Sequence, residues 1–181
     1  MPFTITMAST LFAQVGSSPL AFSSFGALTA SLCLIFVPHV LKAFAVVRKN
    51  RASNKAAKAK DDKKTVPLYD LRNPRSAVKS AIDDTPEGRA IARFQSCHDN
   101  HLEAFPMIVA GVLAAEVTGV PNSVINGAAT VFVAARVAYT VAYCAGTKMW
   151  IANIRSALWF VGLLCVLFLL GAAREARAVK A

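Results

Sequence analysis

The sequence RFQSCHDNHLEAFP, from Arg93 to Pro106, places charged and polar side chains at the start of an apolar run. Burying a charge in hydrocarbon is costly, so such groups usually face a partner, a cavity or a ligand. On a helix, Arg93, Asn100 and Glu103 share one face, because they stand seven and three residues apart. A guanidinium, an amide and a carboxylate on one face can bind a zwitterionic ligand, and they can equally satisfy one another.

The apolar part of this segment is too short to cross a bilayer unaided. Only 12 uncharged residues separate Glu103 from Glu116, whereas a spanning helix needs about 20. A helix over about residues 85–118 crosses only if other helices shield its polar face, so we expect a multi-helix bundle. Thr85 is a typical N-cap before Pro86, which predicts that this helix begins outside the bilayer.

Composition indicates a membrane protein. The chain has 181 residues, of which 55% are hydrophobic and 17% charged, and its mean hydropathy is +0.47. That is too apolar for an ordinary soluble domain. The predicted spans lie at about 22–47, 90–118, 123–145 and 155–173. The sequence therefore predicts an all-α, integral membrane four-helix bundle formed by a single domain, residues 1–181.

Positive charge is concentrated after the first span. The net charge is +10, and 13 of the 20 Lys and Arg residues lie between Arg48 and Arg93. Basic residues beside a span usually face the cytosol and anionic lipid rather than nucleic acid. We therefore predict a basic cytosolic loop over residues 48–84, with a mobile linker from Arg48 to Lys64. Met1 to Ser18 would be a short non-cytosolic tail, and the first span would remain as an anchor, because no secretory or mitochondrial leader precedes it.

The third span carries a second polar group. The sequence RVAYTVAY places Arg136, Tyr139 and Tyr143 on one helix face. Phenol hydroxyls in hydrocarbon need partners, so these residues indicate either a ligand wall or hydrogen bonds between helices. Arg155 and Ser156 open the fourth span, where the guanidinium can reach a ligand at the membrane boundary or anchor the helix.

The cysteine and histidine residues predict no metal site. The four cysteines are scattered without metal or disulfide spacing and are expected to be buried small hydrophobic residues. They are Cys33, Cys97, Cys144 and Cys165. His98 and His101 stand three apart on a helix, which can suit a metal, but no third ligand is indicated, and His39 has no second histidine nearby in sequence.

In combination, these pieces resemble the MAPEG family, the membrane-associated proteins of eicosanoid and glutathione metabolism. The pieces are Asn100, the sequence EAFP from Glu103, then RVAYTVAY and IRSALW. RVAYTVAY and IRS are most similar to the microsomal prostaglandin E synthase branch, and YDLRNPR to poorly characterised microbial members. The resemblance covers roughly Tyr69 to Gly171. It implies a four-helix protomer in a homotrimer, with glutathione bound between neighbouring subunits.

The resemblance also implies roles for individual residues. Asn100 and Glu103 would hold the glutathione peptide, with Glu103 on its α-amino group. Arg155 would lie by the thiol, with Ser156 beside it, and its guanidinium would favour the nucleophilic thiolate. The other implied binding residues are Arg93, Arg136, Tyr139, Tyr143 and, at the end of the first span, Arg48.

The implied function is glutathione transfer to a lipophilic electrophile, or peroxide reduction. In a eukaryotic cell, the implied location is the endoplasmic reticulum or another intracellular membrane. The chain departs from the family in several places, including a longer loop between Tyr143 and Arg155 and three single residues. Ser96 stands where family enzymes commonly have an Arg, and Ala104 stands after Glu103, where they often have an aromatic residue or Thr. Tyr139 stands where the prostaglandin synthase branch has a His. These departures weigh against prostaglandin synthase activity more than against glutathione binding. The alternative is a non-catalytic protein of the same fold that binds or presents lipids.

Overall fold

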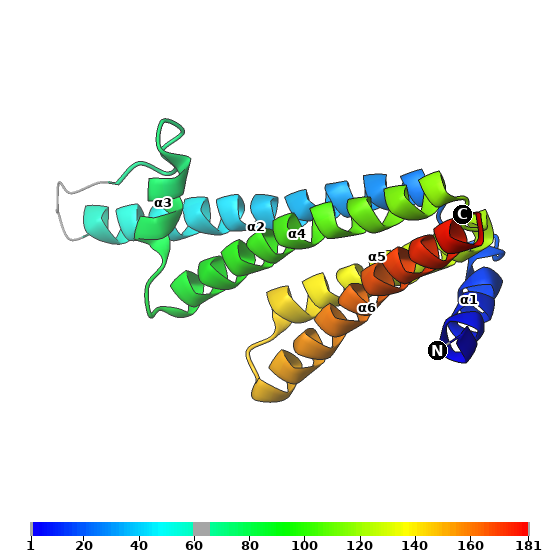
Figure 1. The fold of residues 1–181 in the computed structure, drawn as a ribbon. Coiled ribbons are helices and arrows are strands. Elements are labelled where there is room, and N and C mark those ends of the chain that lie inside the picture. The colour runs from blue at the N-terminus through cyan, green and yellow to red at the C-terminus, as the bar shows by residue number, and fades with distance from the viewer. Residues whose placement is uncertain (1, 60–65, 181) are drawn as a thin grey trace. The chain divides into compact units, whose positions relative to one another are not determined.

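The computed structural model describes residues 2–59 and 66–180, and every regular element in this part of the chain is a helix (Figure 1). Four helices are long and apolar enough to cross a membrane by length and composition. They are α2 (Ser24–Ala59), α4 (Pro86–Thr118), α5 (Asn122–Ala145) and α6 (Met149–Lys180). Two shorter helices are α1 (Pro2–Gly16) and α3 (Pro74–Ala81). The prediction of an all-α protein with four candidate spans is confirmed for the described residues.

The chain divides into two compact units. Unit 1 comprises Met1–Leu34 and Asn100–Ala181, and unit 2 comprises Ile35–Asp99. The first turns of α2 and most of α4 therefore belong to unit 1, together with α1, α5 and α6. Unit 2 contains the rest of α2, all of α3 and the first turns of α4.

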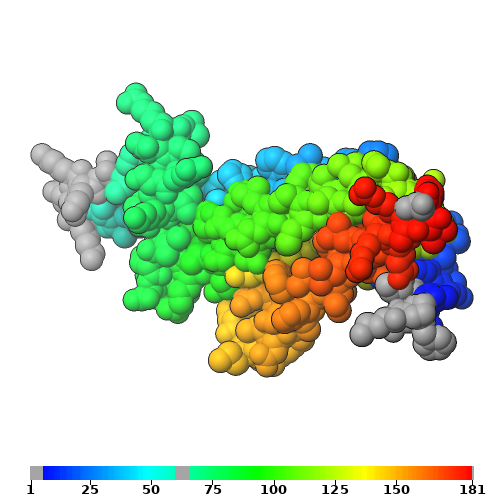
Figure 2. All heavy atoms as spheres, viewed as in Figure 1, coloured from blue at the N-terminus to red at the C-terminus, as the bar shows by residue number. Residues whose placement is uncertain are grey.

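The core of unit 1 is formed by small and branched side chains of α4, α5 and α6. Ile108, Val112, Ile125 and Leu169 are fully buried there. Alanine residues of α5, such as Ala128, lie between them and allow the helices to approach closely. In the space-filling view, side chains close the space between α5 and α6, coloured yellow to red (Figure 2).

One face of α6 remains apolar and exposed. Phe160, Leu164 and Leu167 stand four and three residues apart and are 58%, 62% and 54% exposed. An exposed apolar stripe of this kind would be unfavourable in water and is typical of a helix that faces lipid.

Helix α1 occupies most of the segment that was predicted to be a short tail. A Cβ atom on Gly127 would lie 1.8 Å from the Phe12 carbonyl oxygen, and one on Gly16 would lie 1.8 Å from that of Ser123. Such close backbone contact between α1 and α5 requires glycine. The rings of Phe12 and Phe168 add a contact between α1 and α6, with centroids 4.6 Å apart. The membrane side on which this segment lies stays a prediction.

The junctions within unit 1 are held by polar contacts. The Ser24 hydroxyl donates a 2.6 Å hydrogen bond to Glu116, and the Ser24 N–H donates to the Asn126 side chain at 2.8 Å. These bonds join the start of α2 to α4 and α5. The sequence GVPN, residues 119–122, connects α4 to α5, and Gly119 there has a φ of 77° that favours glycine.

In unit 2, α2 continues as a helix to Ala59, so residues 48–59 are not the predicted mobile linker. Residues 60–65 lie outside the described part of the chain. Alanine and lysine favour a helix, and two asparagines fix this extension to the returning chain. Asn54 exchanges hydrogen bonds with the backbone of Val66 at 2.7 and 2.9 Å, and Asn50 donates to the Pro67 carbonyl at 3.1 Å.

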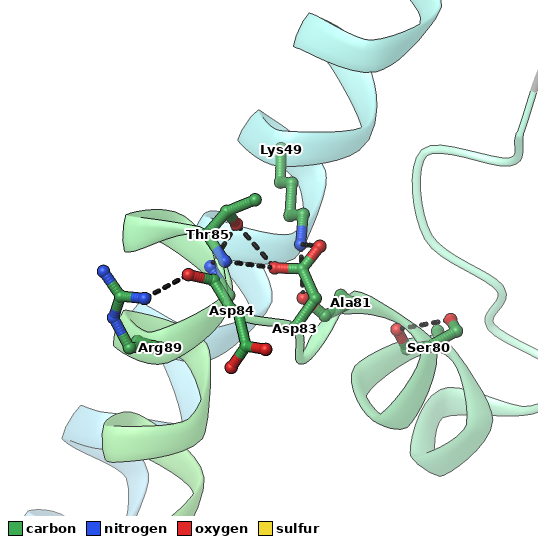
Figure 3. Close-up of polar contacts among 9 residues, drawn as sticks. Lys49, Ser80, Ala81, Asp83, Asp84, Thr85 and Arg89 are labelled. Atoms are coloured by element: carbon green, nitrogen blue, oxygen red, sulfur yellow. Dashed lines mark hydrogen bonds and ion pairs between the residues drawn. The ribbon is translucent and has the colours of Figure 1, made fainter.

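The connection from α3 to α4 is tied to α2 (Figure 3). Lys49 forms a 2.6 Å ion pair with Asp83 and donates to the Ala81 carbonyl at 2.7 Å. Thr85 caps α4, since its hydroxyl accepts the Gly88 N–H at 3.1 Å, which confirms the predicted N-cap. Hydrogen bonds from Lys49 and then Thr85 lower the pKa of Asp83 to about 2.

Candidate functional site

Unit 1 contains a pocket of about 270 Å³ between α4, α5 and α6. Five of the nine predicted site residues line it. The complete lining is Asn100, Tyr139, Tyr143, Arg155, Ser156, Trp159 and Phe160. The pocket therefore combines a guanidinium, an amide, a hydroxyl and two phenols with two apolar aromatic walls.

Arg155 lies over the ring of Tyr143, with its guanidinium carbon 4.1 Å from the ring centroid. Among the described residues it makes no hydrogen bond or ion pair. Helix α6 begins at Met149, so Arg155 stands one and a half turns inside the helix rather than at its first residue. Ser156 is exposed, and its hydroxyl donates to the Ala152 carbonyl at 3.2 Å.

Arg136 lies behind the pocket and not in its lining. Its side chain is 2% exposed, and Nη2 donates a 2.8 Å hydrogen bond to the Asn100 carbonyl. The same nitrogen is 3.2 Å from His101 Nδ1, and the guanidinium carbon is 4.5 Å from the Tyr139 ring centroid. The protomer alone buries this charge, and Arg136 acts as a support for two residues of the pocket wall.

The two tyrosines of the pocket wall touch one another. The ring centroids of Tyr139 and Tyr143 are 5.3 Å apart with planes tilted by 56°. Tyr139 is 3% exposed, whereas Tyr143 is half-buried. The predicted common face of Arg136, Tyr139 and Tyr143 on α5 therefore exists, but its first member faces the protein interior.

Glu103 is exposed on α4 and does not line this pocket. Asn100 reaches the lining one turn earlier, so the two residues expected to hold one peptide have different surroundings in unit 1. In unit 2, Arg48 is exposed near the middle of α2, while Arg93 is partly buried, and its Nε has no hydrogen-bond partner in the described part of the chain.

Sequence reasoning missed three residues of the site. Trp159 stands four residues after Arg155, the helical spacing that brings side chains onto one face, and could have been found from it. Its ring meets that of Phe160 at a centroid distance of 5.2 Å. His101 supports Arg136 and contacts the Thr140 hydroxyl through Nε2 at 2.7 Å. No spacing rule indicates that role, because it depends on two helices.

The described residues contain no group of three or more His, Cys, Asp or Glu side chains that could hold a metal. His98 Nδ1 lies 2.9 Å from the Ile35 carbonyl oxygen, and its ring is 5.0 Å from that of His39. All four cysteines are free. Cys97 and Cys165 are buried as expected, whereas Cys33 is exposed, so the prediction of burial is wrong for Cys33.

Unit 2 also contains a polar network that the sequence did not predict. Lys42 is 5% exposed and donates a 2.6 Å hydrogen bond to the side chain of Gln95. Gln95 in turn donates to Asp99 at 2.7 Å. The network satisfies a buried ammonium between α2 and α4 and fixes these helices to one another within the unit.

A model described as the MAPEG family matches residues 26–174 of the chain. The match extends from α2 into α6 and leaves α1 outside it. No curated protein and no solved structure matches the chain. The resemblance inferred from Asn100, RVAYTVAY and IRSALW is thereby confirmed. Because the family model covers well over half of the sequence and four helices are candidate spans, the chain belongs to the MAPEG family and is an integral membrane protein.

Proposed function

We propose that the protein is a glutathione-dependent membrane enzyme that conjugates lipophilic electrophiles or reduces lipid hydroperoxides. The observation that carries this proposal is the pocket in which Arg155, with no polar partner among the described residues, lies beside Asn100 and two phenols. A permanent cation with free donors next to peptide-binding groups suits an anionic peptide thiol. The MAPEG family includes glutathione-dependent enzymes, which supports this choice of ligand.

The pocket fits part of glutathione. Its volume of about 270 Å³ lies just below the range of about 300–1,000 Å³ that is usual for small-molecule sites. Arg155 provides a cation for one anionic group, but the lining has no carboxylate for the ammonium group of the tripeptide. Glu103 is exposed outside the pocket. We propose that a neighbouring subunit of a homotrimer completes the site. Native mass spectrometry in mild detergent tests this, and a spectrum that contains only monomer would contradict it.

In this proposal glutathione supplies the thiol nucleophile, and the residues of the chain bind and activate it. Arg155 would stabilise the thiolate, since a nearby guanidinium lowers a thiol pKa from about 8.5. Asn100 would bind the peptide through its amide, and Tyr139 and Tyr143 would contact the tripeptide. We also propose Arg93 and Arg48 as residues that contact glutathione.

The apolar wall of the pocket suits a substrate that arrives from the bilayer. Phe160 is 58% exposed and continues the apolar outer face of α6, while Trp159 lies further inside. A lipophilic electrophile could therefore reach the thiolate along α6 without crossing water. We propose residence in the endoplasmic reticulum or another intracellular membrane, which fluorescence co-localisation would test.

The experiment that tests the proposal is a glutathione titration of the purified protein, followed by turnover with an aromatic electrophile. In Arg155→Ala, the pKa of the bound thiol should rise, and glutathione binding should change little at a pH at which the thiol is protonated in both proteins. Each pKa unit is worth about 1.4 kcal/mol, or tenfold in thiolate population near neutral pH. Ultraviolet absorbance of the thiolate during a pH titration measures this directly. If wild type and Arg155→Ala titrate and react alike, the non-catalytic lipid-binding alternative becomes the better explanation.

A further inference from the structure

We infer that Tyr143 is a positioning residue: its ring holds the Arg155 guanidinium so that the N–H donors point into the pocket toward an anion. The inference rests on the proposed function for the identity of that anion, namely the glutathione thiolate. The geometry on which it depends, a guanidinium carbon 4.1 Å from the ring centroid, belongs to the protein alone.

Stacking fixes a guanidinium without using its hydrogen bonds. The group is planar, its donors lie in that plane, and an aromatic ring attracts it through its face. A contact at 4.1 Å is well inside the limit of about 6 Å for such an attraction. Arg155 has no hydrogen bond or ion pair within the described ranges 2–59 and 66–180, so its donors remain available to a ligand.

The ring of Tyr143 is itself supported from the interior. Behind it lies Tyr139, with centroids 5.3 Å apart, and behind Tyr139 lies Arg136 at 4.5 Å. These four residues, Arg155, Tyr143, Tyr139 and Arg136, form a cation–π ladder that runs from the pocket into the core of unit 1. Arg136 at the inner end is bound to the Asn100 carbonyl at 2.8 Å, which anchors the ladder to α4.

The two ends of the ladder differ in a way that assigns their roles. At the inner end, Arg136 is 2% exposed and uses its guanidinium to hold main-chain and side-chain atoms. At the outer end, Arg155 is only half-buried and lines the pocket. Tyr143 stands between the buried inner part of the ladder and the long Arg155 side chain that lines the pocket, where a platform has most effect on position.

Two substitutions separate positioning from direct ligand contact. Tyr143→Phe removes the hydroxyl but keeps the ring, whereas Tyr143→Leu removes both. If Tyr143 acts through Arg155, the Phe variant resembles wild type and the Leu variant does not. Phe160→Leu is a matched control, because Phe160 lines the same pocket but packs edge-to-face against Trp159 rather than against Arg155.

The first measurement needs no ligand. An arginine-specific dicarbonyl reagent is applied to the purified full-length protein, and mass spectrometry follows modification of the peptide that contains Arg155. Loss of the platform uncovers one face of the guanidinium, so Arg155 in Tyr143→Leu should react roughly three- to tenfold faster than in wild type. Tyr143→Phe and Phe160→Leu should react at the wild-type rate. Equal rates in wild type and Tyr143→Leu would overturn the inference.

The second measurement tests the consequence for the ligand. Glutathione sulfonate carries a permanent anion at the position of the sulfur, and S-methylglutathione carries none, so the ratio of their affinities reports contact between Arg155 and that charge. The ratio should fall roughly three- to tenfold in Tyr143→Leu and stay unchanged in Tyr143→Phe. An equal fall in both variants would show that the hydroxyl acts directly and would overturn the inference. If the wild-type protein binds neither analogue, the proposed function fails, and the modification rates still decide whether Tyr143 positions Arg155.

Discussion

Replacing Arg136 by Lys should destabilise the protein more than replacing it by Met. The Arg136 side chain is 2% exposed, so its charge has been removed from water. The Asn100 carbonyl at 2.8 Å, His101 Nδ1 at 3.2 Å and the Tyr139 ring at 4.5 Å compensate for that cost. Lysine keeps the charge but lacks the planar fork that reaches all three groups. Methionine is also unbranched at Cβ, is shorter than arginine and carries no charge.

The magnitudes decide the order of the two variants. A hydrogen bond to a charged group contributes about 1.5–3 kcal/mol, and a desolvated cation–π contact about 2 kcal/mol. Arg136→Met loses both, but it also removes the cost of burying an ion, which is several kcal/mol; we therefore expect a net change of less than about 2 kcal/mol. Arg136→Lys retains the burial cost and loses most of the contacts, so we expect a loss of about 3–5 kcal/mol.

Thermal unfolding in detergent, followed by near-ultraviolet circular dichroism, measures this order. At about 2–4 °C per kcal/mol for a chain of this size, Arg136→Lys should unfold about 6–20 °C below wild type, and Arg136→Met within several degrees of it. Val137→Met is a matched control, because Val137 is the next residue of α5 and is 45% exposed. The reasoning is refuted if the Lys variant is as stable as wild type, or more stable than the Met variant.

Two further predictions concern the two units separately. Gly127→Ala should separate α1 from α5 and lower the unfolding temperature, because its Cβ would lie 1.8 Å from a carbonyl oxygen of α1. Gly162→Ala is the control: its Cβ would have no neighbouring atom closer than 3.5 Å, so its unfolding temperature should stay near that of wild type. Asp83 should make the connection between α3 and α4 acid-sensitive. The Lys49 hydrogen bond lowers its folded-state pKa from 3.8 to about 2, so its contribution is complete above about pH 4 and is lost as the pH falls toward 2. The protection factor of this connection, which is its hydrogen exchange corrected for the intrinsic pH dependence of amide exchange, should therefore fall over that window in wild type, and in Asp83→Asn it should stay constant.

The sequence predicted those parts of the fold that depend on local chemistry. Hydropathy predicted four spans because a bilayer crossing requires a long apolar run, and Thr85 marked the start of α4 because its hydroxyl caps the helix. The extension of α2 to Ala59 was missed, because its polar composition also suits a linker. Asn50 and Asn54 stabilise it through contacts with chain more than ten residues away, which no local pattern contains.

The candidate site was predictable only in part: five of its seven lining residues were among those predicted, whereas the orientation of the predicted residues was not predictable. Spacing on α5 correctly grouped Arg136, Tyr139 and Tyr143, because residues three and four apart share a helix face. It could not show which member faces the interior, since that depends on where α4 and α6 pack. Burial of Arg136 and exposure of Glu103 are outcomes of that packing.

The contrast between Arg136 and Arg155 also explains why the residue type alone does not assign a role. Both guanidinium groups lie over tyrosine rings, at 4.5 and 4.1 Å. Arg136 additionally holds the Asn100 carbonyl, so any ligand that recruited it would break a bond that supports the pocket wall. Arg155 has no such bond among the described residues, so an anion can bind it at no cost in protein hydrogen bonds. A ligand that carries one anionic sulfur should therefore bind Arg155 rather than Arg136. The Arg155 guanidinium already lies over the Tyr143 ring, and its N–H donors make no bond to the described residues.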